Sequence, residues 1–346
     1  MAWRRRDRFT TTPSRVEVNV RAIPLLEPGG WRLLSVDEVS LVGTVPKDYL
    51  AYGAPRLTGD SRDRDRLSVV SSGHIAKKGR FQADARECVT EEIISKIGSM
   101  LPVRMARSRL VRVAKDDVRF LSRDFVDVEH ERLRHGIELA AAYFGATPDE
   151  VAATFQLADR KRERQFYTVE HMLTILDELY GEDSGTLAVD FVKMLAFDAF
   201  VGAPDRHGMN WGVLEPRRSG RVPPRFAPIF DTARGLFVNH SDADLARQAG
   251  RLGRQQFVER YAQRSRPILS VGGAATQDHF GLVAGLAKDH PALFPAMRTV
   301  FDAVSIPAIE RMLQRRFRRI ITQRRLRFIV DLLEFRIGVL RQEKRP

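Results

Sequence analysis

Three polar residues near the middle of the chain are of the types that hold and transfer phosphoryl groups. Asp205 and Asn210 lie in a break containing Gly and Pro that follows an apolar helical run, and Asp231 ends a later apolar run. Residues 211–214 and the run before Asp231 are separated by a polar turn, a pattern that predicts a hairpin. The hairpin would bring the two carboxylates and the amide to one end.

These residue types suit phosphoryl transfer from ATP. One carboxylate can orient the attacking hydroxyl and accept its proton, while an amide oxygen and a second carboxylate hold the Mg²⁺ ions that bridge the ATP phosphates. Magnesium prefers oxygen ligands, and few need come from the protein because phosphate and water supply the rest. The Asp-x-x-x-x-Asn spacing alone is weak evidence, since a polar turn with an Asx cap has the same spelling. The helix before it and the strands around it strengthen the hypothesis.

The amino-acid sequence of this region resembles that of a known family. Asp205-Arg-His-Gly-Met-Asn210, followed by Ala227-Pro-Ile-Phe-Asp231, is similar to the HipA-like kinases, which are distant relatives of the eukaryotic protein-kinase fold. The Asp-Arg-His-x-x-Asn spelling also resembles that of phosphoinositide kinases. The resemblance implies ATP and Mg²⁺ as cofactors, Asp205 as the catalytic aspartate, and Asn210 and Asp231 as the metal ligands. It also implies that His207 supports catalysis through a hydrogen bond that fixes the loop.

A kinase needs a lysine that projects from a strand onto the α- and β-phosphates and pairs with a glutamate of the next helix. Residues 67–70 and 74–78 flank a Ser-Ser-Gly turn and predict a hairpin, with Lys77 and Ile75 on one face. Spacing alone leaves Lys77 an ordinary surface lysine. The resemblance favours Lys77 as the catalytic and ATP-binding lysine, and Lys78 is the alternative.

The partner of this lysine is expected on a helix predicted over residues 85–101, which carries an apolar stripe. Glu91 and Glu92 lie about equally far from the centre of the stripe, so periodicity does not choose between them. In the HipA-like pattern Glu-Cys-x-x-Glu opens this helix, and the resemblance therefore favours Glu91. A solvated helix charge is the alternative.

Strands are predicted over residues 103–113 and 118–126, joined by a turn at 115–117. By analogy with kinases, residues 121–126, at the end of the second of these strands, carry the connection between the lobes. Phe125 and Val126 are therefore the candidates for contact with adenine.

The other charges near Asp205 depart from the patterns of known kinases. Position 207 is His, where protein kinases often carry a lysine, and Met209 replaces the lysine usual in HipA itself. Neutralisation of the γ-phosphate would then come from Lys77, from Mg²⁺ or from an arginine such as Arg234. Arg206 is either a phosphate donor or a surface arginine.

The wider pattern predicts an α+β, two-lobed, protein-kinase-like fold: a small antiparallel β N-lobe with one helix, and a larger, mainly helical C-lobe. Strands are predicted over residues 15–23, 31–34 and 39–45. After residue 129 the pattern is helical, with helices over 150–155, 169–179, 187–201, 245–264, 279–287 and 308–340, the last broken near Thr322. The predicted parts are a basic flexible tail at 1–14, the N-lobe at 15–128 and the C-lobe at 129–346, which contains the catalytic hairpin at 202–237.

Charge is high and unevenly spread. The net charge is +13, and from Glu310 to the end twelve Lys or Arg stand against four Asp or Glu. Such a surface attracts phosphate polymers or acidic proteins, so an antitoxin-like or nucleic-acid partner at the basic C-terminal region is one hypothesis. The other hypothesis is that these basic residues form only the exposed faces of ordinary helices, because no helix-turn-helix, zinc or aromatic stacking pattern accompanies the charge.

The single cysteine, Cys88, excludes an internal disulfide and a cysteine-based metal cluster, and it fits a reducing cytosol. No apolar core follows the basic start as in a secretory signal, and no run approaches the roughly eighteen apolar residues of a membrane span. A cytoplasmic protein without a transmembrane segment is therefore expected.

Taken together, the residues and the resemblance predict an ATP- and Mg²⁺-dependent serine/threonine kinase of the HipA-like group that acts on a protein, as in toxin–antitoxin systems. Two alternatives stay open. One is a phosphoinositide-type lipid kinase, and the other is a non-catalytic pseudokinase that binds nucleic acid.

Overall fold

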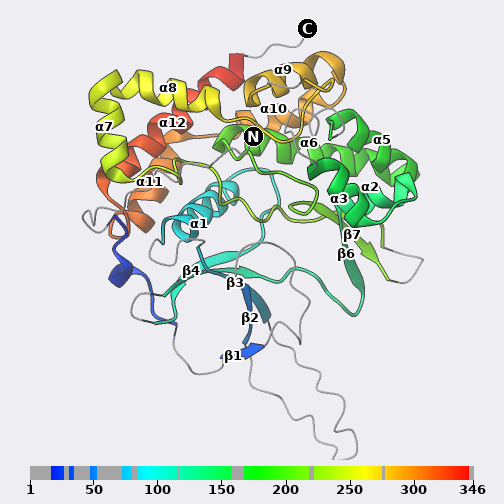
Figure 1. Ribbon diagram of the computed structural model, residues 1–346, viewed down its shortest axis with the longest axis horizontal. Helices are drawn as coiled ribbons and strands as arrows, with labels where there is room; N and C mark the ends of the chain where they lie inside the picture. The colour runs from blue at the N-terminus through cyan, green and yellow to red at the C-terminus, as the bar shows by residue number, and fades with distance from the viewer. Residues whose placement is uncertain are drawn as a thin grey trace, which may run out of the picture.

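The chain folds into a β-rich part and a larger helical part, with one helix between them (Figure 1). The computed structural model describes residues 17–26, 31–34, 47–52, 72–79, 85–114, 117–156, 167–217, 222–274 and 277–342. The predicted tail at 1–14 and the predicted strands at 39–45 and 67–70 lie outside these residues.

A five-stranded antiparallel sheet forms the β-rich part. Its spatial order is β1 (Trp31–Leu34), β2 (Lys47–Tyr52), β3 (Ser72–Lys77), β5 (Val118–Arg123) and β4 (Ser108–Arg112). The predicted strand at 31–34, the strand ending near Lys77 and the pair on either side of 115–117 are confirmed, while β2 was not predicted. The strand predicted over 103–113 begins only at Ser108. Because β3 lies at the centre of the sheet, Lys77 is held between two neighbours, paired in register with Lys47 and Phe120.

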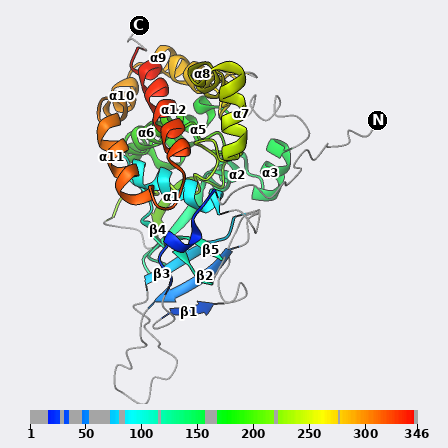
Figure 2. The same ribbon diagram turned by 90° about the vertical axis from the view of Figure 1, so that its left-hand side faces the viewer.

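Helix α1 (Arg86–Gly98) packs on β4 and β5 and separates the sheet from the helical part (Figure 2). The predicted helix at 85–101 is thereby confirmed, and its isoleucines Ile93, Ile94 and Ile97 are almost fully buried. Burial of such side chains stabilises the folded state by about 1.5–3 kcal/mol each. Covered on both sides, α1 connects the two parts of the molecule.

The first described segment corrects the strand predicted over residues 15–23. It contains a short 3₁₀ helix, η1 (Val20–Ala22), and makes single β-bridges from Val18 to Ile321 and from Leu25 to Arg112. Glu17 lies 3.5 Å from Arg86 and 3.6 Å from Arg325. The alternating pattern thus arises because this segment crosses several elements, each contacted by one residue, and not because it pairs along one strand.

A second sheet carries the predicted catalytic hairpin. Strands β7 (Gly212–Pro216) and β8 (Arg225–Phe226) pair antiparallel, as predicted, and β6 (Glu131–His135) adds to the free side of β7. The prediction of helix throughout the region after residue 129 is wrong at β6. Its polar sequence gives no strand signal, and its pairing depends on distant partners, such as Arg132 with Glu215 at 2.7 Å.

Helices make up the remainder of the described chain: α2 (Gly136–Phe144), α3 (Pro148–Gln156), α5 (Val169–Tyr180), η2 (Gly181–Asp183), α6 (Ser184–Val201), α7 (Asp242–Leu252), α8 (Arg254–Arg264), α9 (His279–Asp289), α10 (Phe294–Asp302), α11 (Ile306–Phe317) and α12 (Gln323–Gln342). The six predicted helical regions and the break near Thr322 are confirmed. The prediction over 245–264 is corrected to two helices, because Gly253 adopts a positive φ of 79° between them. Helices α2 and α10 were not predicted. None of the helices described is both long and apolar enough to cross a bilayer.

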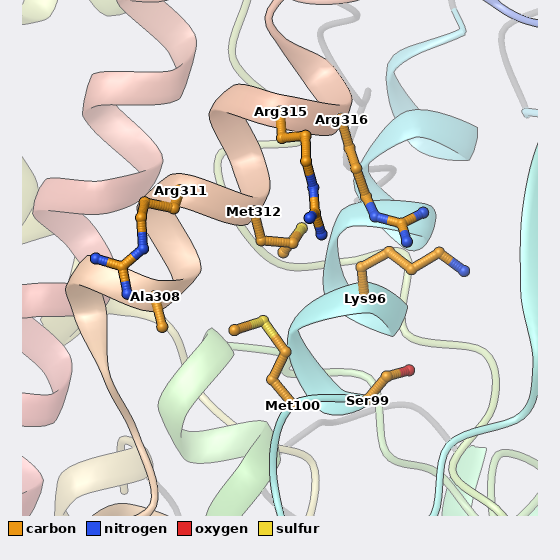
Figure 3. Close-up of a pocket in the computed structure, with 8 residues that line it drawn as sticks. All are labelled: Lys96, Ser99, Met100, Ala308, Arg311, Met312, Arg315 and Arg316. Atoms are coloured by element: carbon orange, nitrogen blue, oxygen red, sulfur yellow. The ribbon is translucent and has the colours of Figure 1, made fainter.

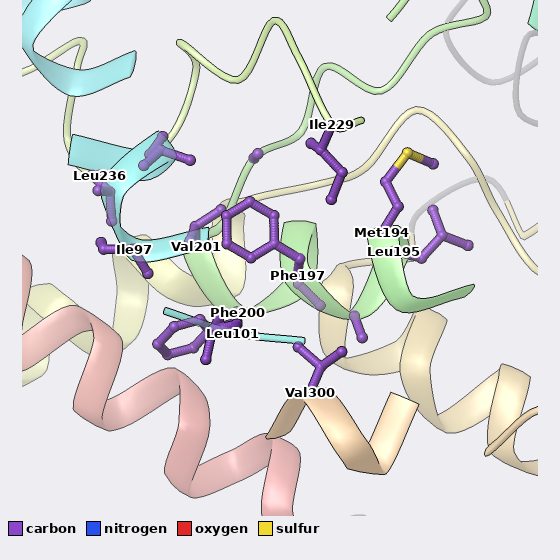
Figure 4. Packing of buried hydrophobic residues seen from close by; sticks show 14 of the residues in the cluster. Ile97, Leu101, Met194, Leu195, Phe197, Phe200, Val201, Ile229, Leu236 and Val300 are labelled. Atoms are coloured by element: carbon purple, nitrogen blue, oxygen red, sulfur yellow. The ribbon is translucent and has the colours of Figure 1, made fainter. Parts of the chain in front are cut away.

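Helix α6 is the centre of the core and leads directly to Asp205. Phe191, Phe197 and Phe200 have no exposed surface. Figure 4 shows Phe197 and Phe200 close to Ile97 and Leu101, which belong to α1 and the turn after it, and to Val300 of α10. The loop that carries the predicted catalytic aspartate therefore starts from a helix whose residues 194–201 are all buried.

Candidate active site

The loop that leads from α6 to Asp205 is held at its start by a buried arginine of α12. The Nε atom of Arg336 donates to Ala199 O at 2.7 Å, and Nη1 donates to Ala262 O at 3.0 Å. These carbonyls belong to the last turns of α6 and α8, where the negative ends of two helix dipoles favour a cation. Burial lowers the pKa of Arg336 to about 10. Gly202, with a φ of 70°, ends α6 beside the guanidinium, and a Cβ there would lie 3.3 Å from Arg336.

The next backbone groups of this loop are held by the segment between α8 and α9. The ring nitrogens of His279 lie 3.1 Å from Ala203 O and 3.0 Å from Ser265 O. The Ser265 hydroxyl donates to Gly202 O at 3.0 Å, and the Ile268 N–H donates to Pro204 O at 3.1 Å. Every carbonyl from 202 to 204 therefore has a donor or an imidazole nitrogen beside it, immediately before Asp205.

Arg206 corrects both interpretations offered by the sequence. It is neither exposed nor directed at a phosphate: its guanidinium is buried and makes two bonds to Asp198 of α6, at 2.7 and 2.8 Å. It also donates to the carbonyls of Asn210 and Phe230. Burial raises the pKa of Asp198, and the adjacent guanidinium opposes that shift. Arg206 thus ties α6, the 205–210 loop and the strand before Asp231 to one another.

Asp205 and Asn210 lie at one end of this loop. The Asn210 Nδ2 atom donates to Asp205 O at 2.7 Å, so the amide oxygen is the atom left for another ligand. The Asp205 carboxylate is about one-third exposed and lies 3.5 Å from Nε of Arg234. His207 accepts a hydrogen bond from the Met209 N–H through Nδ1 at 3.2 Å, a contact of the loop-fixing kind. At Gly208 a Cβ would lie 2.9 Å from the Ile137 nitrogen, so only glycine fits where the loop meets α2.

Asp231 follows β8 after a bridge that joins the two parts of the molecule. Ile229 pairs with Met105, and its N–H donates to Arg104 O at 2.7 Å. Two residues later, Asp231 has a φ of 55°, a left-handed conformation that is uncommon for residues other than glycine but tolerated by aspartate. The change of direction brings its carboxylate to the sheet, where Oδ1 lies 3.2 Å from the Lys77 Nζ atom.

Lys77 and Glu91 form a buried ion pair beside Asp231. Their Nζ and Oε1 atoms are 2.7 Å apart, and less than a tenth of either side chain is exposed. Burial favours the neutral lysine, but the Glu91 and Asp231 carboxylates outweigh it and raise the pKa of Lys77. Burial, aided by the nearby Asp231 carboxylate, raises the pKa of Glu91 to about 7 although Lys77 acts in the opposite direction. The structure therefore brings together three residues that are distant in sequence.

Lys78 and Glu92, the alternatives to Lys77 and Glu91 that the sequence left open, have other partners. Lys78 lies 3.5 Å from Asp117, and Glu92 accepts from Ser108 at 2.7 Å and pairs with Lys96 at 3.1 Å. Glu91 and Glu92 are both buried, at 3% and 5% exposure, because α1 is covered on most sides. Cys88 is also buried, which raises the pKa of its thiol to about 12 and leaves it unreactive.

Phe125 and Val126 follow β5 at the edge of this site. The Phe125 ring lies 5.6 Å from that of Phe230, the residue before Asp231, and the Phe230 ring also contacts His135. The Val126 N–H donates to the Asp124 carboxylate at 3.0 Å. Their contact with adenine stays a prediction.

The residues present fit a magnesium–nucleotide complex. Within the described chain there is no group of three His, Cys, Asp or Glu that could hold a metal by itself. Asp231 and the Asn210 amide would supply two oxygen ligands, the sparse protein contribution that Mg²⁺ requires when phosphates and water complete its shell.

Sequence reasoning missed the supporting residues of this site. Asp198 and Arg206 are eight residues apart, with the helix end between them. His279 and Arg336 contact the loop from positions far along the chain. A charged residue at an apolar position of a predicted helix, such as Arg336 between Leu333, Ile337 and Leu340, is the signal that could have identified one of them.

The fold and these residues together define the class of protein, a kinase-like α+β fold. The chain resembles the crystal structure of the proinflammatory kinase CtkA of Helicobacter pylori, with a TM-score of 0.67 and 14% identity, covering 92% of this chain and 97% of that one. It also matches HipA of Shewanella oneidensis MR-1, solved with HipB and its operator DNA, with a TM-score of 0.48 and 11% identity, over 92% of this chain and 73% of that one. No curated protein matches the sequence.

A family model for the HipA-like C-terminal domain matches residues 39–286. The chain therefore belongs to the HipA-like C-terminal domain family, and a kinase-like function follows at the level of that family.

Proposed function

We propose that the protein is an ATP- and Mg²⁺-dependent kinase that transfers the γ-phosphoryl group to a serine or threonine hydroxyl of a protein. The observation that carries the proposal is the convergence of Lys77, Glu91 and Asp231, with contacts of 2.7 and 3.2 Å, next to a loop that presents Asp205 and Asn210. Phosphoryl transfer depends mainly on positioning and on stabilising charge, and these residues are of the required types.

The roles follow from the chemistry of each group. Lys77, kept charged and oriented by Glu91, binds the α- and β-phosphates. Asp231 and the amide oxygen of Asn210 hold magnesium, which when bound neutralises charge on the phosphate oxygens. Asp205 orients the substrate hydroxyl. The oxygen of that hydroxyl bonds to the γ-phosphorus, the bond to the β,γ-bridging oxygen breaks, the proton passes to Asp205, and ADP leaves.

Arg234 is proposed to complete the charge balance. Its Nε atom lies 3.5 Å from the Asp205 carboxylate, and about a third of each side chain is exposed. A guanidinium here would take the place of the lysine that protein kinases often carry two residues after the aspartate, where this chain has His207.

The central test is Asp205→Asn, which keeps the size of the side chain and removes the proton acceptor. Because the carboxylate is one-third exposed, the fold should be retained, and phosphoryl transfer should fall by about 10²–10⁴-fold. Transfer of ³²P from labelled ATP, followed by mass spectrometry of a protein lysate, measures it. The matched control is Asp331→Asn, another partly exposed aspartate paired with an arginine, Arg254, at 2.8 Å. An equal rate in Asp205→Asn and the parent would remove Asp205 from this role.

The proposal also covers the substrate and a partner. Mass spectrometry identifies the residue type that gains phosphate, and phosphate found only on lipid would overturn the protein-kinase assignment. A partner of antitoxin type, suggested by the solved HipA complex with HipB and operator DNA, is tested by co-purification from cells of the source organism.

A further inference from the structure

A basic pocket lies between α1 and α11, on a part of the molecule that the proposed catalytic residues do not use (Figure 3). Its volume is about 560 Å³, within the range of sites that bind small ligands or a few side chains. The lining residues come from α1, the turn after it and α11: Lys96, Ser99, Met100, Ala308, Arg311, Met312, Arg315 and Arg316.

The charges of the pocket are of one sign. Four of the lining residues are cations and none is a carboxylate. Lys96 is paired with Glu92, whose carboxylate also interacts electrostatically with Arg316, whereas Arg311 and Arg315 form no ion pair with any residue that the structure describes. Arg311 and Arg315 are four residues apart on α11, a spacing at which like charges repel. An anionic occupant would relieve that repulsion.

The floor of the pocket is apolar. Met100 is 40% exposed, which is unusual for a large apolar side chain, and Met312 lies beside it at 7% exposure. Figure 3 shows Arg315 and Arg316 extending from α11 toward Lys96 of α1. The side chains of Met312 and Met100 lie between Arg311 and Lys96 in this view. Methionine is flexible and polarizable and adapts to varied apolar side chains. The pocket therefore combines anion-binding walls with a place for an apolar group.

The walls of the pocket belong to two helices, α1 and α11, that pack mainly on different elements. Helix α1 rests mainly on β4 and β5, whereas α11 rests on α12. An occupant that contacts both would add a link between α1 and α11, and α1 carries Glu91, the partner of Lys77.

We propose that this pocket docks an acidic peptide segment of another protein, with an apolar side chain inserted between Met100 and Met312. The chain's own ends do not fit, because residues 1–16 and 343–346 are net basic. A nucleic acid fits less well, because no aromatic residue lines the pocket for base stacking and the cations surround a hollow and do not follow an extended groove. This proposal does not rest on the role proposed for Asp205.

The test measures binding of a short fluorescent peptide of glutamates with one central leucine to the full chain, by fluorescence anisotropy at low and physiological salt. Arg315→Gln/Arg316→Gln should weaken binding by about tenfold or more. Arg318→Gln/Arg319→Gln removes the same charge from exposed residues next to the pocket and should change binding less than about twofold. Met100→Gln should also weaken the leucine peptide, but not an all-glutamate peptide. Circular dichroism and thermal melting establish that each variant is folded.

Hydrogen exchange provides the second measurement. The leucine peptide should slow exchange of α1 and α11 amides in the parent but not in Arg315→Gln/Arg316→Gln. Equal weakening by the two arginine pairs would reduce the pocket to general surface charge and overturn the proposal. It would also be overturned if neither peptide bound, or if a DNA duplex bound more tightly than the peptide and lost affinity in the same pocket variant.

Discussion

On one side of the proposed site, the loop before Asp205 is held through its backbone, whereas on the other side Lys77 is held through side chains. Arg206 and Arg336 donate to four carbonyls of the loop and its neighbours. Lys77 is positioned by the carboxylates of Glu91 and Asp231. Carbonyl acceptors do not titrate, and the one carboxylate on this side, Asp198, is matched by the always charged Arg206, whereas both acceptors of Lys77 are carboxylates. The side proposed to accept the proton is therefore rigid, and the side proposed to bind phosphate can respond to its charge environment.

The largest effect should come from breaking the rigid side at Arg206. In Arg206→Met, Asp198 stays buried without its cation, and the carbonyls of Asn210 and Phe230 lose their donor. Removal of one member of a buried ion pair costs about 3–5 kcal/mol of the free energy of unfolding. Urea denaturation measures it, with exposed Arg318→Met as the control. A loss below that of the control would show that the loop is held by other means.

Arg336→Met should have an intermediate effect. The methionine keeps much of the buried stem, and no buried carboxylate is left alone, but Ala199 O and Ala262 O lose their donors at the ends of two helices. The expected loss is about 1–3 kcal/mol, typical of leaving buried polar groups unpaired. Urea denaturation gives the stability, and hydrogen exchange of the α6 and α8 ends gives the location. Unchanged exchange there would contradict the assignment of Arg336 as a cap of both helices.

The smallest effect near neutral pH is expected for Lys77→Met, and it should depend on pH. Burial has already raised the pKa of Glu91 to about 7 in the parent. Without Lys77 the pKa of this carboxyl should rise further, so that the carboxyl keeps its proton to a higher pH. Because the folded state then binds more protons than the unfolded state over a wider range, stability relative to the parent should fall as the pH rises above about 7. Below that pH, where Glu91 is protonated in both proteins, the difference in melting temperature should be small and constant.

Two variants isolate this effect. Lys77→Met/Glu91→Gln should abolish the extra pH dependence, because no buried carboxyl is left at position 91. Lys78→Met removes a partly exposed lysine that is 3.5 Å from Asp117 and should change stability by less than about 0.5 kcal/mol at every pH. A pH-independent loss in Lys77→Met, equal to that of Arg206→Met, would remove the distinction between the two sides.

The part of the site that could be predicted is the part that is local in sequence. Asp205, Asn210 and Asp231 follow from one helix, one turn and one hairpin, each of which has its own pattern of apolar and turn residues. The choice of Glu91 over Glu92 could not come from periodicity, since α1 buries both. The resemblance to a family favoured Glu91, and the structure places that residue beside Lys77.

What could not be predicted depends on contacts between distant residues. Strand β6 is polar and becomes a strand only by pairing with β7, and the segment after Glu17 alternates without forming a strand. Arg206 resembles any exposed arginine until Asp198 and two carbonyls are placed around it. Contacts of this kind cannot be predicted from the local sequence around each residue.

The bridge from Val18 to Ile321, with the Asn19 N–H donating to Ile320 O at 2.7 Å, has a consequence for biosynthesis. Val18 leaves the ribosome long before Ile321, so this contact forms only after the turn between α11 and α12 has emerged. The sheet and α1 can assemble while synthesis continues, but the segment around Val18 must wait, exposed to chaperones and proteases, until Ile321 has been made.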